Sequence, residues 1–388
     1  MEERNQTAVA EFVLLGLTKH GELRYLLFLV FLAMYLMNLL GNGTMILVIG
    51  GNPQLHTPMY FLLCNLSFLD MCFTSVTVPK MLNNLIFGKK TICYSECITQ
   101  LYFFLVFGSS ECVLLSIMAY DRYVAICNPL HYVTVMNKKV CLSMSAASFI
   151  IGIMNACINT FLVFQLSFCN SNKVQHFFCD LTPLLELSCT DTSINELVIF
   201  TEGSLIVVLP FFIIVVSYIH IITAILKIQS TDGRCKTFST CSSHLTVVTL
   251  FYGTLIFIYF RPSSSYSLEK DRIASVVYNV LSPMLNPFIY SLRNRDVKIA
   301  LRKALQRKLV FCLFFPSIKI MLKVASSMDK LYDEIFSDIA GGDNFVKASG
   351  TPNNFIALER LYKQSKMFSK TLNTQALGKE DILQKMLK

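Results

Sequence analysis

The sequence predicts an all-α membrane protein, a bundle of seven transmembrane helices followed by a short amphipathic helix. Of its 388 residues 54% are hydrophobic and only 15% are charged, whereas soluble domains carry roughly 25% charged residues. Seven apolar runs have the length of about 20 residues that a helix needs to cross a bilayer. Asn-Pro and Thr-Pro pairs lie between several of these runs and indicate loops and helix starts. A chain with so few charges cannot cover a globular surface with them, but it can face lipid.

The apolar runs define the expected domain organisation. The predicted spans are residues 26–49, 59–78, 98–120, 140–164, 197–226, 239–260 and 273–292. They place a bundle at 26–292, after an extracellular amino tail at 1–25 and before a juxtamembrane helix at 293–308. The opening residues lack the basic head, short apolar stretch and small-residue cleavage site of a secretory signal peptide. The first span is therefore expected to be an uncleaved anchor.

Three features predict a plasma-membrane protein with its amino terminus outside the cell. Lys and Arg are in excess on the inner side only when the basic residues after the last span are counted. Asn5-Gln6-Thr7 is a glycosylation acceptor in the amino tail. Three cysteines lie between the fourth and fifth runs, as an oxidising compartment permits. Although the net charge is +9, the densest basic cluster follows the last span, which indicates anionic lipid headgroups rather than nucleic acid.

A charged pair, Asp121 and Arg122, lies at the inner end of the third span and precedes Tyr123. Placing a carboxylate and a guanidinium at the hydrocarbon boundary costs desolvation energy, so such a pair indicates a functional site. The alternative is that Arg122 extends to lipid headgroups while Asp121 neutralises it. Glu111 precedes Arg122 by eleven residues, about three helical turns or roughly 16 Å, so both are expected on one face.

Two carboxyls and two amides are expected at mid-membrane depth: Asn42, Asp70, Glu111 and Asn286. We expect them to form one cluster inside the bundle, where a proton or a Na⁺ would relieve the repulsion between the acids. The alternative is separate, protonated carboxyls bonded to nearby backbone. Pro287 follows Asn286 and is expected to kink the seventh span, which would make a hinge, or only a packing feature, before Tyr290.

Together these motifs resemble a rhodopsin-type G-protein-coupled receptor. Asp121-Arg122-Tyr123 ends span three, and Asn286-Pro287-Phe288-Ile289-Tyr290 closes span seven. Longer strings resemble the olfactory receptor family, in its class II tetrapod branch, and the resemblance covers about residues 5–308. The matching strings lie at 55–60, 118–127, 217–218, 236–244 and 283–287.

The resemblance implies a receptor, not an enzyme, that binds small volatile molecules in the outer half of the bundle. It would activate a stimulatory G protein of the olfactory type and raise cyclic AMP. Under this hypothesis Arg122 leaves Asp121, span six swings outward, and two tyrosines stabilise the open form. The coupling residues would be Asp121, Arg122, Tyr123, Tyr218, Asn286, Pro287 and Tyr290.

The resemblance also implies two disulfides, Cys97–Cys179 and Cys169–Cys189. Sequence alone leaves the connectivity open, because four cysteines allow three pairings and Cys93 is a further outer cysteine. His176 and Cys179 have a spacing that could bind a metal, a reading ranked below the disulfide. No other cofactor is expected.

The ligand site is expected where apolar side chains surround a few polar groups. The candidates are Phe104, Leu105, Gly108, Ser109, Asp180, Leu181, Glu202, Ile206, Tyr252, Leu255 and Tyr259. For each of them ordinary interhelical packing is the alternative. Glu202 is the most specific candidate, because an acid in the outer half could select a basic or hydroxylated odorant, although it could also lie at the water boundary.

The sequence shows no motif of a transporter or a membrane enzyme. A transporter should show matched halves with broken helices, and none is evident; a membrane enzyme should show a nucleophile, metal or phosphate motif, and none is found. A receptor of the same family used outside the nose stays an alternative.

In the juxtamembrane helix Leu301 and Leu305 are expected to face lipid. Residues 309–388 are predicted to be a largely disordered cytoplasmic tail, either regulatory or an extended reading frame without selected function, and the absence of any recognisable motif favours the second.

Overall fold

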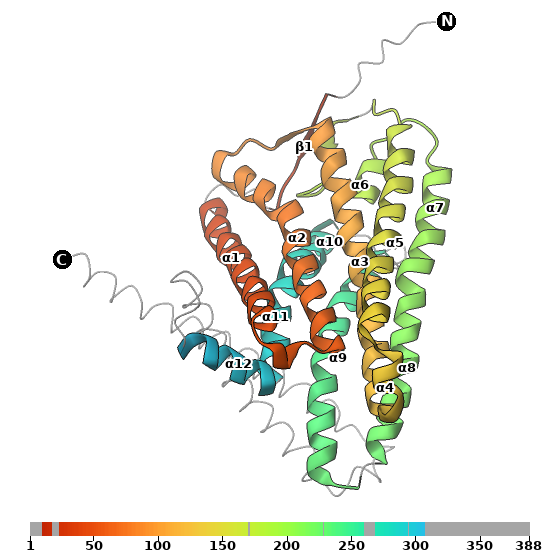
Figure 1. Ribbon diagram of the computed structural model, residues 1–388. Helices are drawn as coiled ribbons and strands as arrows, with labels where there is room; N and C mark the ends of the chain where they lie inside the picture. The colour runs from red at the N-terminus through yellow and green to blue at the C-terminus, as the bar shows by residue number, and fades with distance from the viewer. Residues whose placement is uncertain are drawn as a thin grey trace, which may run out of the picture. The chain divides into compact units, whose positions relative to one another are not determined.

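The computed structural model describes residues 10–17, 23–169, 171–227, 229–259, 268–293 and 295–306. These residues form a bundle of long helices with a small sheet at one end (Figure 1). We call the end with the sheet the sheet end and the opposite end the Arg122 end. The predicted glycosylation site at Asn5 and the tail from residue 307 onward lie outside the described residues.

Within the described residues, seven helical passes make up the bundle. They are α1 (Leu23–Gly50), α2 (Pro58–Phe87), α3 (Tyr94–Cys127), α5 (Lys138–Phe164), the run of α7 (Ser193–Gly203), η3 (Ser204–Val208) and α8 (Leu209–Leu226), α9 (Thr231–Tyr259), and the run of α10 (Leu268–Val276), η5 (Val277–Leu281) and α11 (Ser282–Arg293). Shorter helices lie between or after them: η1 (Pro53–Leu55), η2 (Pro129–His131), α4 (Tyr132–Val135), α6 (Leu181–Leu185) and α12 (Arg295–Gln306). The prediction of an all-α seven-helix bundle is confirmed.

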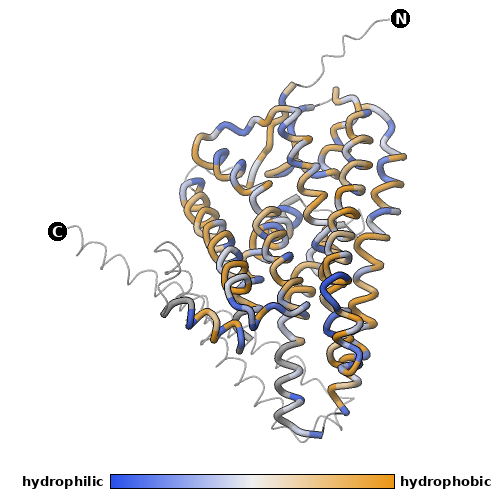
Figure 2. Tube along the Cα trace, viewed as in Figure 1, coloured by the Kyte–Doolittle hydropathy of each residue, from blue (hydrophilic) through white to orange (hydrophobic). Residues whose placement is uncertain are grey.

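Among the described residues six helical passes are long and apolar enough to cross a membrane. The seventh predicted span, 273–292, is divided by the π-helical turn η5, which joins α10 to α11. Large apolar side chains such as Leu29, Phe161 and Phe200 are exposed on the outer faces of their helices. Figure 2 shows the hydrophobic colour along much of α1, α5 and the run of α7 and α8, and hydrophilic segments at several loops. A surface of this kind suits lipid rather than water.

The helices are longer than the apolar runs that predicted them. Residues 59–78 were expected for the second span, but α2 continues through Pro79 to Phe87. It ends at Gly88, whose φ of 70° is the left-handed conformation that glycine adopts without a steric penalty. Hydropathy predicts only the part of a helix that lies within lipid. Backbone hydrogen bonding lets the helix continue beyond the hydrocarbon layer. A proline inside a membrane helix is tolerated because neighbouring groups can satisfy the freed carbonyl.

The sheet has the strand order β2-β1-β3 and was not predicted. Strand β1 (Glu11–Leu14) pairs antiparallel with β2 (Thr91–Cys93), with Phe12 opposite Ile92. It pairs in parallel with β3 (Lys173–Val174), with Val13 opposite Lys173. Phe12 and Leu14 are fully buried in a second apolar cluster around the start of α3. Part of the predicted amino tail therefore packs against the loops that cover the sheet end.

The juxtamembrane helix forms, but its predicted orientation is wrong at one residue. Leu301 was expected to face lipid, whereas only 1% of its surface is exposed. Val297 and Ala300 are buried with it in the main apolar cluster, and Tyr60 of α2 donates to Asp296 at 3.4 Å. The apolar face of α12 therefore packs on the bundle itself, because positions 297, 300 and 301 share one face of a helix. The side chain of Leu305 lies outside the described residues.

Candidate functional site

Four of the seven predicted coupling residues meet at the Arg122 end of α3. Asp121 and Arg122 are 2% and 6% exposed. The Asp121 carboxylate accepts a hydrogen bond from the Tyr132 hydroxyl at 2.8 Å. The Arg122 guanidinium interacts electrostatically with Tyr218, Tyr290 and Asp121. The structure thus brings Asp121, Arg122, Tyr218 and Tyr290 together, whereas the ring of Tyr123 lies beside His220, with centroids 5.7 Å apart.

Tyr132 is a contact of the coupling site that sequence reasoning missed. It lies in α4, beyond the break at Pro129, so no helical spacing relates it to Asp121. Burial raises the pKa of the Tyr132 hydroxyl, and the Asp121 carboxylate raises it further. The hydroxyl therefore keeps its proton and stays a donor to Asp121.

A second missed residue, His244, joins α9 to α3. One ring nitrogen, Nε2, lies 3.1 Å from the Leu115 carbonyl, and Nδ1 lies 2.9 Å from the Tyr218 hydroxyl. Because a carbonyl can only accept, Nε2 carries a proton. The Tyr218 hydroxyl also donates to the Cys241 carbonyl at 3.2 Å. His244 falls inside the string 236–244 that carried the resemblance, but the sequence assigned it no role. The Tyr252 hydroxyl adds a second link, since it donates to the Cys112 carbonyl at 2.8 Å.

Two members of the predicted mid-membrane cluster, Asp70 and Asn286, are hydrogen-bonded to each other in the structure. Asn286 Nδ2 donates to both carboxylate oxygens of Asp70, at 2.9 and 3.0 Å. Asn42 Nδ2 donates to the carbonyl of Pro283, at 3.1 Å, and also to Asn38. Pro283 lies in the turn before Pro287, which is within α11. These hydrogen bonds join α1 and α2 to the part of α11 around the predicted hinge.

Glu111 completes this cluster. It is fully buried, and among the described residues neither of its carboxylate oxygens has a hydrogen-bond partner. It interacts electrostatically with Asp70. Asn42 Oδ1 and Asn286 Oδ1 are likewise buried without a partner in the described residues. These four oxygen atoms are hard donors, the kind of ligand that a small cation binds.

Aromatic rings gather around Phe104, the first of the ligand-site candidates. Its ring centroid lies 5.2 Å from that of Phe73 and 4.7 Å from that of Phe178. Tyr278 packs edge-on against it at 5.9 Å. Gly108, one turn along α3, is half-buried, and a methyl group at its Cα would lie 3.4 Å from Phe73 and 3.7 Å from the Tyr278 hydroxyl. Leu105 is half-buried on the same helix.

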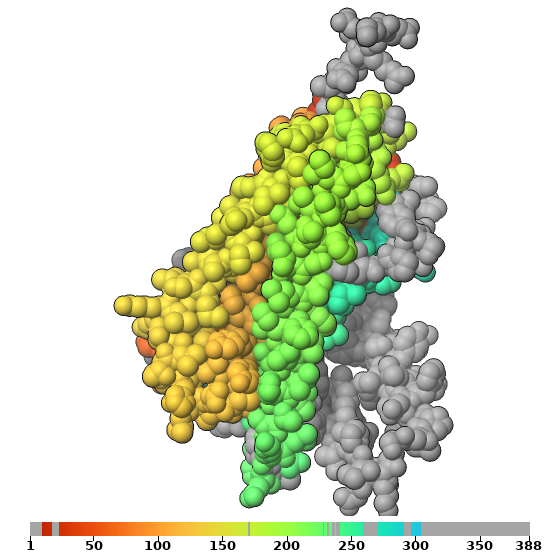
Figure 3. Space-filling model, turned by 90° about the vertical axis from the view of Figure 1, so that its right-hand side faces the viewer, coloured from red at the N-terminus to blue at the C-terminus, as the bar shows by residue number. Residues whose placement is uncertain are grey.

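A chain of polar contacts runs from Ser109 on α3 to Glu202 on α7. Asn155 Nδ2 donates to Ser109 Oγ at 2.8 Å. Asn159 Nδ2 donates to Asn155 Oδ1 at 3.0 Å and to Glu202 Oε2 at 2.7 Å. Figure 3 shows α5 beside the run of α7 and α8 on this face of the bundle. Glu202 is half-buried and accepts from a neutral amide through one of its two oxygens, and the π-helical turn η3 begins two residues later.

The remaining ligand-site candidates lie on different elements and differ in burial. Leu255 is buried and Ile206 is half-buried against the main apolar cluster. Asp180 Oδ1 accepts from the amide of Leu181 and caps α6. The side chain of Tyr259 lies outside the described residues.

Both disulfides implied by the resemblance are present. Cys97 is bonded to Cys179 and Cys169 to Cys189, with Cα atoms 5.5 and 5.9 Å apart. Cys93 is exposed and free. The sulfur of Cys179 is consumed in its bridge, so the spacing between His176 and Cys179 does not provide a thiolate for a metal.

His176 instead packs inside the loop that carries Cys179. Its ring lies 4.6 Å from that of Phe177 and 4.4 Å from that of Phe178. Nε2 lies 3.2 Å from Ser275 Oγ, which connects the loop to α10. Burial, with a smaller contribution from Arg272, lowers the pKa of His176 to about 3. The ring is therefore neutral at physiological pH.

Comparison with known proteins places this arrangement in a family. A family model described as "Olfactory receptor" matches residues 31–308. The chain belongs to the olfactory receptor family. It is 55% identical to Olfactory receptor 1f45 of Rattus norvegicus over 305 residues, which are 79% of this chain and 97% of the relative. It is 51% identical to Olfactory receptor 1F1 of Homo sapiens over 307 residues, 79% and 98% of the two chains.

A solved structure shows the fold independently. The chain resembles squid rhodopsin with a TM-score of 0.59 at 18% identity, over 79% of this chain and 87% of the rhodopsin chain. Family membership and this fold together make the protein a multi-pass membrane receptor with the rhodopsin-like fold and not an enzyme, as the sequence predicted. A small-molecule ligand and a G protein as partners follow from the family.

Proposed function

We propose that this receptor binds small volatile odorants toward the sheet end of the bundle and activates a stimulatory G protein of the olfactory type, which raises cyclic AMP. The observation that carries the proposal is the meeting of Arg122 with Tyr218 and Tyr290 at the other end. Membership of the olfactory receptor family supports the choice of ligand and of partner. The proposed orientation puts the sheet end outside the cell and the Arg122 end in the cytoplasm, because the disulfides require an oxidising compartment.

Activation requires that α9 separate from α3 at the Arg122 end. Two hydrogen bonds join these helices, His244 to Leu115 and Tyr252 to Cys112. An outward swing of α9 breaks the first of these bonds and releases Tyr218 from His244. Tyr218 and Tyr290, which already interact with Arg122 in this structure, keep that interaction in the open form. An odorant drives this change only by its higher affinity for the open form.

The mid-membrane cluster is proposed to hold a proton or a Na⁺. Glu111 and the amide oxygens of Asn42 and Asn286 supply the ligands, together with the Asp70 carboxylate that Asn286 orients. A bound cation would neutralise the repulsion between two buried carboxylates in the closed form. The chain's own contribution is the fixed geometry that Asn42 and Asn286 impose.

Glu202 is proposed to select the odorant. One of its oxygens is bound by Asn159, so the second can accept from a ligand. A protonated amine is the group that a half-buried carboxylate attracts most strongly, and a hydroxyl is the weaker alternative.

An odorant panel tests the proposed function. Cells that display the receptor at the surface should raise cyclic AMP on exposure to at least one odorant, and Arg122→Ala at equal surface expression should not. A normal odorant response of Arg122→Ala would show that the coupling site is assigned wrongly. Expression of the receptor in olfactory tissue separates an odorant receptor from a member of the family used elsewhere.

A further inference from the structure

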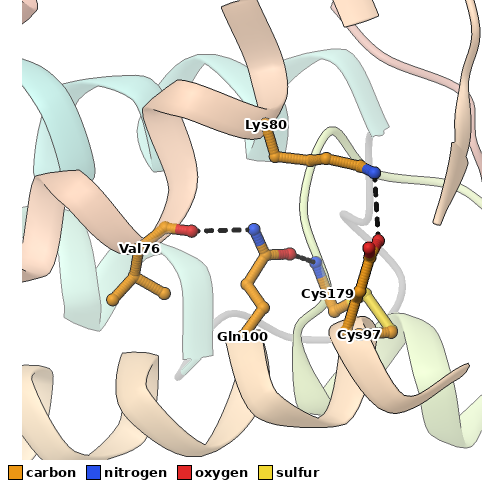
Figure 4. Close-up of polar contacts among 6 residues, drawn as sticks. Val76, Lys80, Cys97, Gln100 and Cys179 are labelled. Atoms are coloured by element: carbon orange, nitrogen blue, oxygen red, sulfur yellow. Dashed lines mark hydrogen bonds and ion pairs between the residues drawn. A yellow bond between two sulfur atoms is a disulfide. The ribbon is translucent and has the colours of Figure 1, made fainter. Parts of the chain in front are cut away.

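We propose that Gln100 is a positioning residue for ligand recognition, a clamp that holds the loop segment around Cys179 over the ligand site. The inference rests on the proposed function for its link to odorants, although the clamp itself rests on geometry. Gln100 lies on α3, one turn from Cys97, and is 7% exposed. Figure 4 shows its side chain between α2 and the loop.

The Gln100 amide makes two hydrogen bonds in opposite directions. Its Oε1 accepts from the backbone amide of Cys179 at 2.9 Å. Its Nε2 donates to the Val76 carbonyl on α2 at 2.9 Å. One side chain thus joins α2, α3 and the loop, and both of its polar ends are satisfied in a buried setting.

The two attachments at Cys179 have different effects. The disulfide from Cys97 fixes the position of the Cys179 sulfur, but rotation about the side-chain bonds still allows the backbone to turn. The hydrogen bond from the Cys179 amide to Gln100 fixes the backbone as well. Cys97 and Gln100 are three residues apart and therefore lie on one face of α3. Without Gln100 the disulfide would hold the Cys179 sulfur but not its backbone amide.

The orientation of Cys179 decides where its neighbours point. Phe178 precedes it and packs against Phe104, a ligand-site candidate. Asp180 follows it and caps α6. Turning the Cys179 backbone would displace both residues. The clamp therefore sets the shape of the loop over the site while it leaves the coupling residues at the other end untouched.

The attachment to α2 lies beside Pro79. Proline has no amide hydrogen, so the carbonyl of Ser75 loses its intrahelical donor and the helix is opened locally. Val76, the next residue, directs its carbonyl to Gln100. The clamp thus joins the loop to α2 beside Pro79, so a movement of this part of α2 would be transmitted to the loop.

Hydrogen exchange on the full chain in lipid nanodiscs, without odorant, tests the clamp directly. Gln100→Met has a similar length and no hydrogen bonds, so segment 177–181 should exchange about fivefold faster, the loss expected for one hydrogen bond. The matched control is Lys80→Met, which removes the ion pair of 3.2 Å between Lys80 and Glu96 on the same two helices without touching Cys179. Unchanged exchange in Gln100→Met, or equal acceleration in both variants, would overturn the proposal.

Concentration–response curves at matched surface expression test the effect on recognition. Gln100→Met should raise the half-maximal odorant concentration about tenfold, which corresponds to about 1.4 kcal/mol of binding free energy, and should keep the maximal response. A fall in the maximal response with unchanged potency would overturn the positioning role.

Gln100→Glu keeps an oxygen for the Cys179 amide and should restore slow exchange of the loop. If Gln100→Met does not reach the surface, the shorter Gln100→Asn should show the same changes. If the wild type answers no odorant, the proposed function fails while the exchange experiment still decides the clamp.

Discussion

Replacing Glu202 by Gln should separate basic from neutral odorants. The substitution keeps the shape of the side chain and an oxygen that can accept from Asn159, whose amide lies 2.7 Å from Glu202 Oε2. It removes only the negative charge. The response to an odorant that carries an ammonium group should therefore weaken, while the response to a hydroxylated odorant of the same carbon chain should change little.

The size of this effect follows from the setting of Glu202. An ammonium about 4 Å from a carboxylate gains about 4 kcal/mol at an effective dielectric constant near 20. Glu202 is only half-buried, so water screens much of this attraction, and the ammonium loses its own hydration. About 1.4 kcal/mol remains after that discount, which is a factor of about ten in affinity.

The assay is cyclic AMP accumulation in cells, with concentration–response curves for a primary alkylamine and the alcohol of equal chain length. In Glu202→Gln the half-maximal concentration of the amine should rise about tenfold relative to that of the alcohol. Glu196 is the matched control because it is an exposed acid on the same helix, where it accepts from Thr192. Equal shifts for amine and alcohol, or a selective loss of the amine response in Glu196→Gln, would refute the reasoning.

Three further outcomes test other parts of the account. Asn286→Ala removes the donor to both oxygens of buried Asp70, so the thermal midpoint of the purified receptor should fall by about 3–6 °C; an unchanged midpoint would remove the cluster's stabilising role. The bridges Cys97–Cys179 and Cys169–Cys189 close segments with sequence separations of 82 and 20, and chain entropy assigns them about 4.5 and 3.3 kcal/mol. Serine replacement of the first pair should therefore lower the midpoint more than replacement of the second, and the reverse order would contradict this. The pKa of His176 is lowered to about 3, so the unfolded chain binds more protons than the folded chain between pH 6.5 and 3, and stability falls as the pH drops through that window. His176→Phe should reduce the loss of midpoint between pH 7 and pH 5, and an identical loss would show that His176 does not contribute to it.

The sequence predicted which residues lie on one face of a helix and which polar residues of different spans lie at the same depth. Intramembrane acids are costly unless they are paired, and this cost predicted that Asp70 and Asn286 would meet. The helical repeat placed Glu111 and Arg122 on one buried face of α3. These predictions needed only the period of a helix and the solvation of charge.

Contacts across loops were not predictable in the same way. Tyr132 meets Asp121 across a loop that contains Pro129, and Gln100 meets Cys179 across a separation of 79 residues. Nothing in either local sequence encodes the partner. Strand β1 is too short for a clear alternating pattern, and its pairing depends on two loops that fold elsewhere. Leu301 was misplaced because an amphipathic helix beside a bundle can turn its apolar face to protein or to lipid, and hydrophobicity does not distinguish the two.

Odorant-dependent nucleotide exchange measures directly whether Arg122 couples odorant binding to the G protein. The purified full chain in lipid nanodiscs is mixed with a stimulatory G protein of the olfactory type, and release of bound GDP is followed with and without an odorant that binds. The odorant should accelerate GDP release by the wild type and not by Arg122→Ala, with equal odorant binding by both. Equal acceleration by Arg122→Ala, or no acceleration by a wild-type receptor that binds the odorant, would contradict this prediction.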